Sequence, residues 1–222
     1  MIIDKGVISM TMNNLVKMEV ICQSAIKLTT TEQFSIYFDP YNIAKATHDA
    51  NLVFLTHSHG DHFSVSDLNK VINAETKVVA PIEMKEALEK LGLDFMLVEP
   101  NQHYEMLNIN FATIPAYNID KPFHPKANGW VGYVVELFGV KYYISGDLDL
   151  IDEVKKVVCD VAFVPVGGHY TMDPQQAAQL INQIKPKLAI PTHYGSVVGN
   201  MQQGAEFIAC LQSDIEGLCL LK

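Results

Sequence analysis

The stretch Leu52-Val-Phe-Leu-Thr-His-Ser-His-Gly-Asp-His62 joins a short apolar run to a group of residues that commonly bind metal ions. His57 and His59 are two residues apart, so a continued strand pitch places both imidazoles on one side, where they can hold one metal. The glycine that follows lets the chain turn and brings Asp61 and His62 to a neighbouring position. Without a cation, four such side chains at one strand end would repel and desolvate each other. The stretch therefore predicts a metal site.

Hydrophobic periodicity on both sides of this stretch predicts further strands and helices. Strands are predicted at residues 18–22, 34–38, 52–56, 77–80, 95–98, 109–115, 131–137, 141–145, 161–164, 188–191 and 218–221. Helices are predicted at residues 66–72, 82–91, 150–157, 174–184 and 201–211. The start of the fourth helix is the best defined, because Asp173 is a suitable N-cap and Gln176 occupies the capping-box position.

The order of these elements favours an α/β fold of the αββα sandwich type. Residues 109–145 hold consecutive strands with no helix between them, which a doubly wound sheet does not explain. We therefore expect two mixed β-sheets packed face to face, with the helices on the outer faces. Residues 118–128 lack periodicity and predict a long loop, and long loops in compact domains are often functional. Residues 1–17 are an extra strand, a hairpin or a frayed end.

Length and composition limit the kind of protein this is. With 222 residues, of which 49% are hydrophobic, we expect one folded domain spanning residues 1–222. No apolar run approaches the roughly 18 residues of a membrane span. An acid and a glycine interrupt the apolar residues of the N-terminus, which predicts no signal peptide and a cytoplasmic location. The four cysteines form no C-x-x-C pair, which favours thiols in a reducing compartment over disulfides.

The net charge of the chain indicates which kinds of partner are unlikely. The formal net charge is −9, with 25 acidic and 16 basic residues, and no run of basic residues is present. A nucleic acid is therefore an unlikely partner, because binding to its backbone relies on clustered positive charge. We expect a small-molecule substrate and no membrane association, and the oligomeric state stays open.

The pattern H-x-H-x-D-H after an apolar strand resembles the signature of the metallo-β-lactamase superfamily. The resemblance extends to Phe38-Asp39-Pro40-Tyr41, to Gly146-Asp147 and to Pro191-Thr192-His193-Tyr194-Gly195, which stand in the family's order. It is closest to the branch of ascorbate-6-phosphate lactonase-like proteins and uncharacterised metal-dependent hydrolases. It implies two metal ions, with Asp147 bridging them and His193 completing the second site beside Asp61 and His62.

Two departures from the family pattern bear on the site. The first metal normally takes a third histidine at the position of Asn118, whose amide oxygen is a poor ligand for zinc. His124 and His169 could replace it; we favour His124, and expect this first site to bind metal more weakly than the second. Cys22-Gln23-Ser24 occupies a turn where relatives often carry a histidine, which predicts the loss of one polar group from the cleft rim.

The resemblance implies an enzyme, a metal-dependent hydrolase. Two cations, expected to be Zn²⁺ with Mn²⁺ or Fe²⁺ as alternatives, would activate water for attack on a small ester, lactone, amide or phosphoester. Asp61 would act as the catalytic residue that orients the water, and Tyr170, Tyr194 and Thr192 could contact substrate or serve in packing. The alternatives are a phosphodiesterase or nuclease, a mononuclear iron dioxygenase, and a non-enzymatic metal-binding or regulatory protein.

Overall fold

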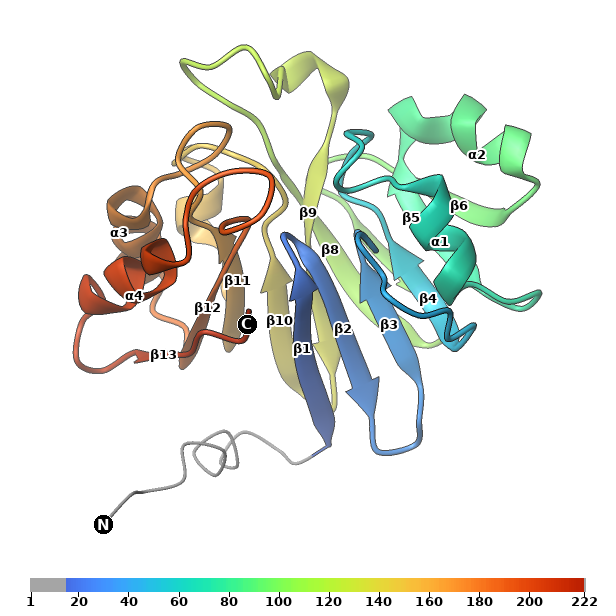
Figure 1. Cartoon of the computed structure of the whole chain (residues 1–222), viewed down its shortest axis with the longest axis horizontal. Helices are drawn as coiled ribbons and strands as arrows, with labels where there is room; N and C mark the ends of the chain where they lie inside the picture. The colour runs from blue at the N-terminus through green and yellow to red at the C-terminus, as the bar shows by residue number, and fades with distance from the viewer. Residues whose placement is uncertain (1–14, 222) are drawn as a thin grey trace.

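Two β-sheets lie face to face in the computed structural model, which describes residues 15–221 (Figure 1). The first sheet pairs its strands in chain order: β1 (Val16–Cys22), β2 (Ala25–Thr30), β3 (Ser35–Phe38), β4 (Ala50–Phe54), β5 (Lys77–Pro81) and β6 (Asp94–Val98). The pairs from β1 to β3 are antiparallel and those from β3 to β6 are parallel. The expectation for residues 1–17 falls mostly outside the described residues, and β1 begins at Val16.

The second sheet also runs in chain order across its width. Its strands are β7 (His103–Met106), β8 (Ile109–Pro115), β9 (Val131–Leu137), β10 (Val140–Ile144), β11 (Val161–Pro165), β12 (Leu188–Thr192) and β13 (Glu216–Gly217). The pairs from β7 to β10 are antiparallel and those from β10 to β13 are parallel. Both sheets are therefore mixed, as predicted.

The inner faces of the two sheets form the central core. Phe54 of the first sheet packs on Tyr133 and Phe111 of the second, with ring centroids 4.8 and 5.0 Å apart. Their alternation with outward-facing residues along each strand explains why these segments form strands. Burial of apolar surface between the sheets is the main force that holds them together.

The α-helices of the described residues cover the outer faces of the two sheets (Figure 1). α1 (Val65–Val71) and α2 (Lys85–Leu91) pack on the first sheet, and α3 (Pro174–Ile184) and α4 (Gln202–Ala209) pack on the second. α3 begins as predicted, with a capping box formed by Asp173 and Gln176. The predicted αββα sandwich is confirmed. None of the helices in residues 15–221 is long and apolar enough to span a lipid bilayer.

Several local predictions were wrong. The helix predicted at residues 150–157 is a turn followed by a short 3₁₀ helix, η4 (Val154–Lys156). The carboxylate of Asp149, which could have capped a helix there, instead accepts from the backbone N–H of Ile119 and binds Lys121. The strand predicted at residues 218–221 is displaced to β13, because the backbone pairing with β12 ends at Leu218.

Two strands were missed, and most of the other elements differ from their predicted bounds by one or two residues, whereas β8, β9 and α3 have the predicted bounds. β2 alternates buried Ile26 and Leu28 with polar residues, and β7 is short and half exposed, so neither forms a strong apolar run. The helix predicted at residues 82–91 divides into a 3₁₀ turn, η2 (Ile82–Met84), and α2. The long loop predicted after residue 117 is present and contains one 3₁₀ turn, η3 (Lys126–Asn128).

Candidate metal centre

All seven residues predicted to bind metal meet at one edge of the sandwich. They come from the loops that follow the carboxyl ends of four strands, β4, β8, β10 and β12. In order along the chain they are His57, His59, Asp61, His62, His124, Asp147 and His193. His59 and Asp61 are partly exposed and the other five are buried. The sandwich thus brings residues from four separate segments to a single place.

Asp147 lies at the centre of this cluster. Its Oδ2 atom is 2.9 Å from Nε2 of His193 and 3.4 Å from Nε2 of both His62 and His124. Asp61 lies at the side of the cluster, with Oδ2 3.4 Å from Nε2 of His193. A carboxylate that faces histidines from three loops could serve as a ligand shared by neighbouring cations.

The ligand atoms form overlapping sets, in each of which all atoms lie within 4.8 Å of one another. These sets are His57, His59 and His124; His57, His62 and Asp147; and Asp61, His62 and His193. Nitrogen and carboxylate donors in groups of three, open on one side, have the composition of catalytic zinc sites. These sets, which share residues with one another, could supply the ligands of a metal centre.

Asn118 does not point into the cluster but holds His124 in place. Its Oδ1 atom accepts hydrogen bonds from the backbone N–H (3.0 Å) and from Nδ1 (2.9 Å) of His124, while its Nδ2 donates to the carbonyl of Tyr170. Because Nδ1 of His124 carries the proton in this arrangement, Nε2 is left free as a ligand atom. His169 is exposed and packs on Phe123 and Tyr170, away from the cluster.

A buried carboxylate, Asp39, orients two of the histidines. It accepts a hydrogen bond from Nδ1 of His62 (2.7 Å) and another from the hydroxyl of Thr56 (2.6 Å). With its proton given to Asp39, the Thr56 oxygen accepts from Nδ1 of His57 at 2.9 Å. Both imidazoles therefore present Nε2 to the cluster, in the way that outer carboxylates orient metal-binding histidines.

Sequence reasoning assigned no role to Asp39 or Thr56. The available signal was an acid directly after the apolar run at residues 34–38, at the same strand edge as the histidine motif. Its significance depends on β3 pairing in parallel with β4, which places the ends of both strands together. That pairing could not be read from the local sequence.

Gln23, in the turn where the loss of a polar group from the cleft rim was predicted, supports the cluster from a buried position. Gln23 is fully buried and its Nε2 donates to Oδ2 of Asp61 at 3.3 Å. The main-chain carbonyl of Gln23 accepts a hydrogen bond from the backbone N–H of His193 at 2.9 Å. This bond helps to hold His193 at φ +57°, a left-handed conformation that is uncommon for a residue other than glycine. Gln23 thus supports two of the cluster residues at once.

Gly146 is required by the close approach of the two sheets beside the cluster. It has φ +65°, and a Cβ there would lie 3.2 Å from both Cβ of Thr56 and the carbonyl of Val131. Any larger residue would push the end of β10 away from the end of β4. Gly146 therefore fixes the position of its neighbour Asp147 relative to the histidine motif.

Burial and the neighbouring carboxylates shift the pKa values of the cluster histidines in different directions. Burial lowers the pKa of His193, but the carboxylates of Asp147 and Asp61 outweigh it and raise the pKa to about 9. Burial likewise lowers the pKa of His62, and Asp147 and Asp39 raise it well above its usual value. His57 has the opposite balance, since burial and the charge of His62 keep its pKa well below the usual value. In the metal-free protein, protons on His62 and His193 thus balance the buried carboxylates.

The donor atoms themselves fit metal ions. Nε2 of His62, of His124 and of His193, together with Oδ1 of Asp147, are buried and have no hydrogen-bond partner among the described residues. Buried polar atoms are almost always paired, because an unpaired one costs about 1–3 kcal/mol. Four such atoms facing one another indicate a cluster built to bind cations.

Metal uptake should therefore release protons. Because the pKa of His193 is raised to about 9, its proton is retained at neutral pH and must leave before zinc binds. We expect net proton release on zinc binding at pH 7 and weaker zinc binding as the pH falls further below 9. Calorimetric zinc titrations in buffers of different ionisation enthalpy measure both, and an absence of proton release at pH 7 would contradict this view of the cluster.

Removing the Asn118 amide should weaken the set that contains His124. We expect Asn118→Ala to lower zinc affinity at this set about 10- to 100-fold, the usual effect of losing a partner that orients a ligand. Asn118→Asp, which keeps the acceptor, should retain most of the affinity.

The fluorescence of Trp130, the sole tryptophan, can report on this set during a zinc titration, because its ring lies 4.9 Å from the rings of His57 and His59. Asn110→Ala, at an exposed position of β8, is the control; equal losses in both alanine variants would refute the assigned role.

Comparisons with known proteins agree with this geometry. A family model described as the β-lactamase superfamily domain matches residues 18–193. A UPF0173 metal-dependent hydrolase from Thermococcus onnurineus is 30% identical over 156 residues, which cover 67% of this chain and 68% of the relative. The span of the family model contains all seven cluster residues.

Solved structures are similar over nearly the whole chain. A protein from Parabacteroides distasonis, described as a metal-dependent hydrolase, superposes with a TM-score of 0.79 at 26% identity, covering 93% of this chain and 94% of that one. Igni18, a metallo hydrolase from Ignicoccus hospitalis, gives a TM-score of 0.73 at 22% identity over 92% and 94% of the two chains. The second similarity is one of fold alone.

Proposed function

The chain belongs to the β-lactamase superfamily, and from this we propose that it is a hydrolase in which two metal ions activate water for attack on a small ester, lactone, amide or phosphoester. One observation carries the proposal: Oδ2 of Asp147 lies within 3.4 Å of ligand nitrogens from three different loops. The names of the UPF0173 relatives, which describe metal-dependent hydrolases, support the same class of reaction.

The donor set favours zinc. Five imidazoles and two carboxylates are available, a mixture that suits Zn²⁺ and also accommodates Fe²⁺ or Mn²⁺. We assign His57, His59 and His124 to one ion, Asp61, His62 and His193 to the other, and Asp147 to both. When bound, such ions lower the pKa of water and polarise the bond to be cleaved.

Asp61 is the residue we assign to proton handling. It lines the pocket next to the cluster, and its side chain is 18% exposed, so it can reach a bound water. Burial raises its pKa, but the nearby imidazoles of His193 and His62 outweigh this and lower the pKa to about 2. Asp61 is therefore ionised at neutral pH, accepts a hydrogen bond from the attacking water and passes the proton towards the leaving group. Gln23 holds its carboxylate in position.

Other residues of the chain keep the site ordered and partly dry. Trp130 packs against His57, His59 and His124, and its indole N–H donates to Glu83 at 2.9 Å. Excluding water on this side strengthens the electrostatic interactions within the cluster. Tyr194 and Thr192 are buried, which favours packing roles for them, whereas Tyr170 lines the pocket.

Elemental analysis followed by a hydrolase panel tests this function. Protein purified without added metal is expected to contain zinc and to hydrolyse at least one class among carboxylic esters, lactones, amides and phosphoesters. Iron as the bound metal, with oxygen consumption and no hydrolysis, would favour a dioxygenase. Stoichiometric metal with no turnover of any kind would favour a binding or regulatory protein.

A further inference from the structure

The pocket beside the cluster has a lining that bears on the substrate. It has a volume of about 390 Å³, which suits a small molecule. Besides the cluster residues, three apolar or aromatic side chains line it: Phe123, Tyr170 and Val197. Phe123 and Val197 come from the loops that carry His124 and His193.

Two of these side chains form a fixed aromatic wall. The rings of Phe123 and Tyr170 pack edge to face, with centroids 4.7 Å apart and an interplanar angle of 85°. The carbonyl of Tyr170 accepts from Nδ2 of Asn118, and Asn118 also holds His124, next to Phe123 in the chain. The wall is thus tied to the same residue that orients a cluster histidine. A planar or apolar group of a substrate would pack on it with little rearrangement.

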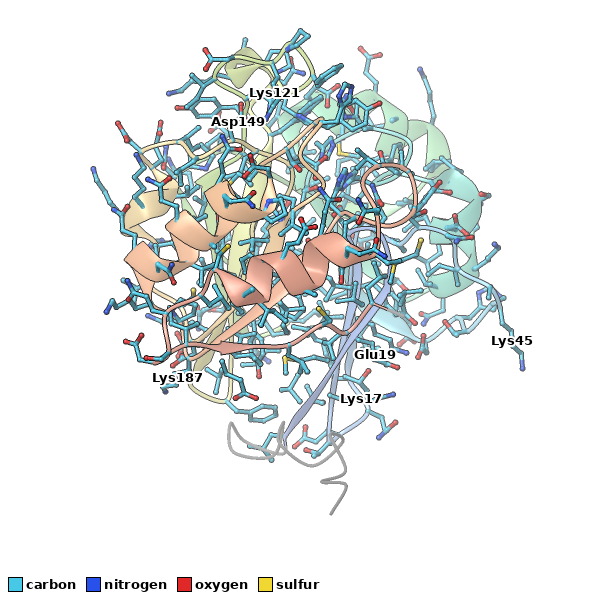
Figure 2. The ribbon with its side chains drawn as sticks, turned by 60° about the vertical axis from the view of Figure 1, so that its left-hand side comes forward. Lys17, Glu19, Lys45, Lys121, Asp149 and Lys187 are labelled. Carbon is cyan, nitrogen blue, oxygen red and sulfur yellow. The ribbon has the colours of Figure 1, made fainter. Side chains whose placement is uncertain are left out.

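Among the described residues no lysine lines the pocket, and the two lysines on the loop that carries Phe123 are already paired. The chain contains no arginine, so the fork that binds phosphate or carboxylate bidentately is missing from the sequence. Lys121 binds Asp149 and donates to the carbonyl of Thr171; Figure 2 labels this lysine and aspartate together. Lys126 pairs with Glu153 at 2.9 Å. An anionic group on the wall side of the pocket would meet no counter-charge.

We propose that the substrate is a neutral carboxylic ester, lactone or amide with an aromatic or aliphatic group against the wall of Phe123 and Tyr170, and not a phosphoester. The inference rests on the proposed hydrolase function. For an ester, water adds to the acyl carbon, the acyl C–O bond breaks, and the products are a carboxylate, an alcohol and one proton.

Binding of two matched probes tests the substrate class without turnover. The probes are benzohydroxamate and 4-carboxybenzohydroxamate, which carry the same metal-binding group and differ by one carboxylate on the ring. Benzohydroxamate, whose ring carries no charge, is called the neutral probe. Calorimetry on the zinc-loaded full chain is expected to show that it binds at least about tenfold more tightly than 4-carboxybenzohydroxamate, because the unpaired ring carboxylate opposes binding. In parallel, 4-nitrophenyl butyrate should be hydrolysed with a higher kcat/KM than bis(4-nitrophenyl) phosphate.

Variants at the pocket rim connect the preference to the proposed wall. Val197→Lys supplies a cation, so the preference for the neutral probe should shrink severalfold while zinc content is unchanged. Phe123→Ala should weaken binding of the neutral probe by about tenfold through loss of ring packing. Val158→Lys is the matched control, since Val158 is 73% exposed and does not line this pocket; it should change neither probe.

The outcomes separate the two proposals. Equal or tighter binding of the carboxylated probe, or faster turnover of the phosphodiester, would overturn the substrate class while leaving the hydrolase intact. A preference for the neutral probe in a protein that hydrolyses no ester, lactone, amide or phosphoester would support the pocket's selectivity and reject the hydrolase function.

Discussion

Asp147→Asn is expected to remove metal and activity together. The Oδ2 atom of Asp147 faces His62, His124 and His193, so both proposed ions depend on it. An amide provides neither the negative charge nor the second anionic oxygen that bridging requires. Since loss of even an outer partner of a ligand costs 10- to 100-fold, loss of the bridge should lower zinc affinity and kcat/KM by about 100-fold or more.

Elemental analysis and kinetics on the same preparation measure this effect. Asp152→Asn is the control, because the Asp152 side chain is 89% exposed and pairs with Lys155 outside the cluster. Two zinc ions per chain at unchanged affinity in Asp147→Asn would show that Asp147 does not bridge. Circular dichroism must show a folded protein for the comparison to hold, and the fold should survive because removing a buried carboxylate also removes a buried charge.

Asp61→Ala should abolish hydrolysis while leaving the fold intact. Asp61 lies in the loop after β4, outside the three hydrophobic clusters, so its removal leaves no cavity in the core. Loss of a group that orients water and moves a proton typically costs about 10²- to 10⁴-fold in rate. The first set and Asp147 remain, so part of the zinc should stay bound.

Gln23→Ala provides a graded comparison for this prediction. It removes the hydrogen bond to Asp61 but leaves the carboxylate, so its loss of activity should be smaller. Steady-state kinetics on the zinc-loaded variants, with zinc content measured beside them, decide the matter. Full activity of Asp61→Ala with metal bound would exclude the proposed role of Asp61.

Much of the fold could be predicted from the sequence, because most of its strands are short apolar runs with a clear hydrophobic periodicity. β8 and β9 have the predicted bounds, and α3 starts at its capping box. The missed β2 shows the limit of this reasoning. Its polar positions are stabilised by contacts from other segments, such as the pairing of Lys27 with Asp49 at 2.5 Å, which local periodicity does not contain.

Of the candidate site, only the residues whose ligand atoms form the cluster could be predicted from the sequence. The histidine motif, Asp147 and His193 have recognisable positions at strand ends, and the structure brings them together with His124. The supporting residues could not be identified, because Asp39, Gln23 and Asn118 act through pairs separated by 23, 38 and 6 positions. Asn118 is the clearest example: its amide looks like a missing ligand in the sequence and is a partner of His124 in the structure.

Metal stoichiometry of the full chain is the most direct test of the proposed centre. The protein is stripped with a chelator, reconstituted with zinc, freed of loosely bound metal and measured by elemental analysis beside Asp147→Asn. Two zinc ions per chain in the parent protein, and at most one in the variant, are the predicted result. Less than one zinc per chain in a folded parent protein, or the same content in both proteins, would contradict a two-metal centre built on Asp147.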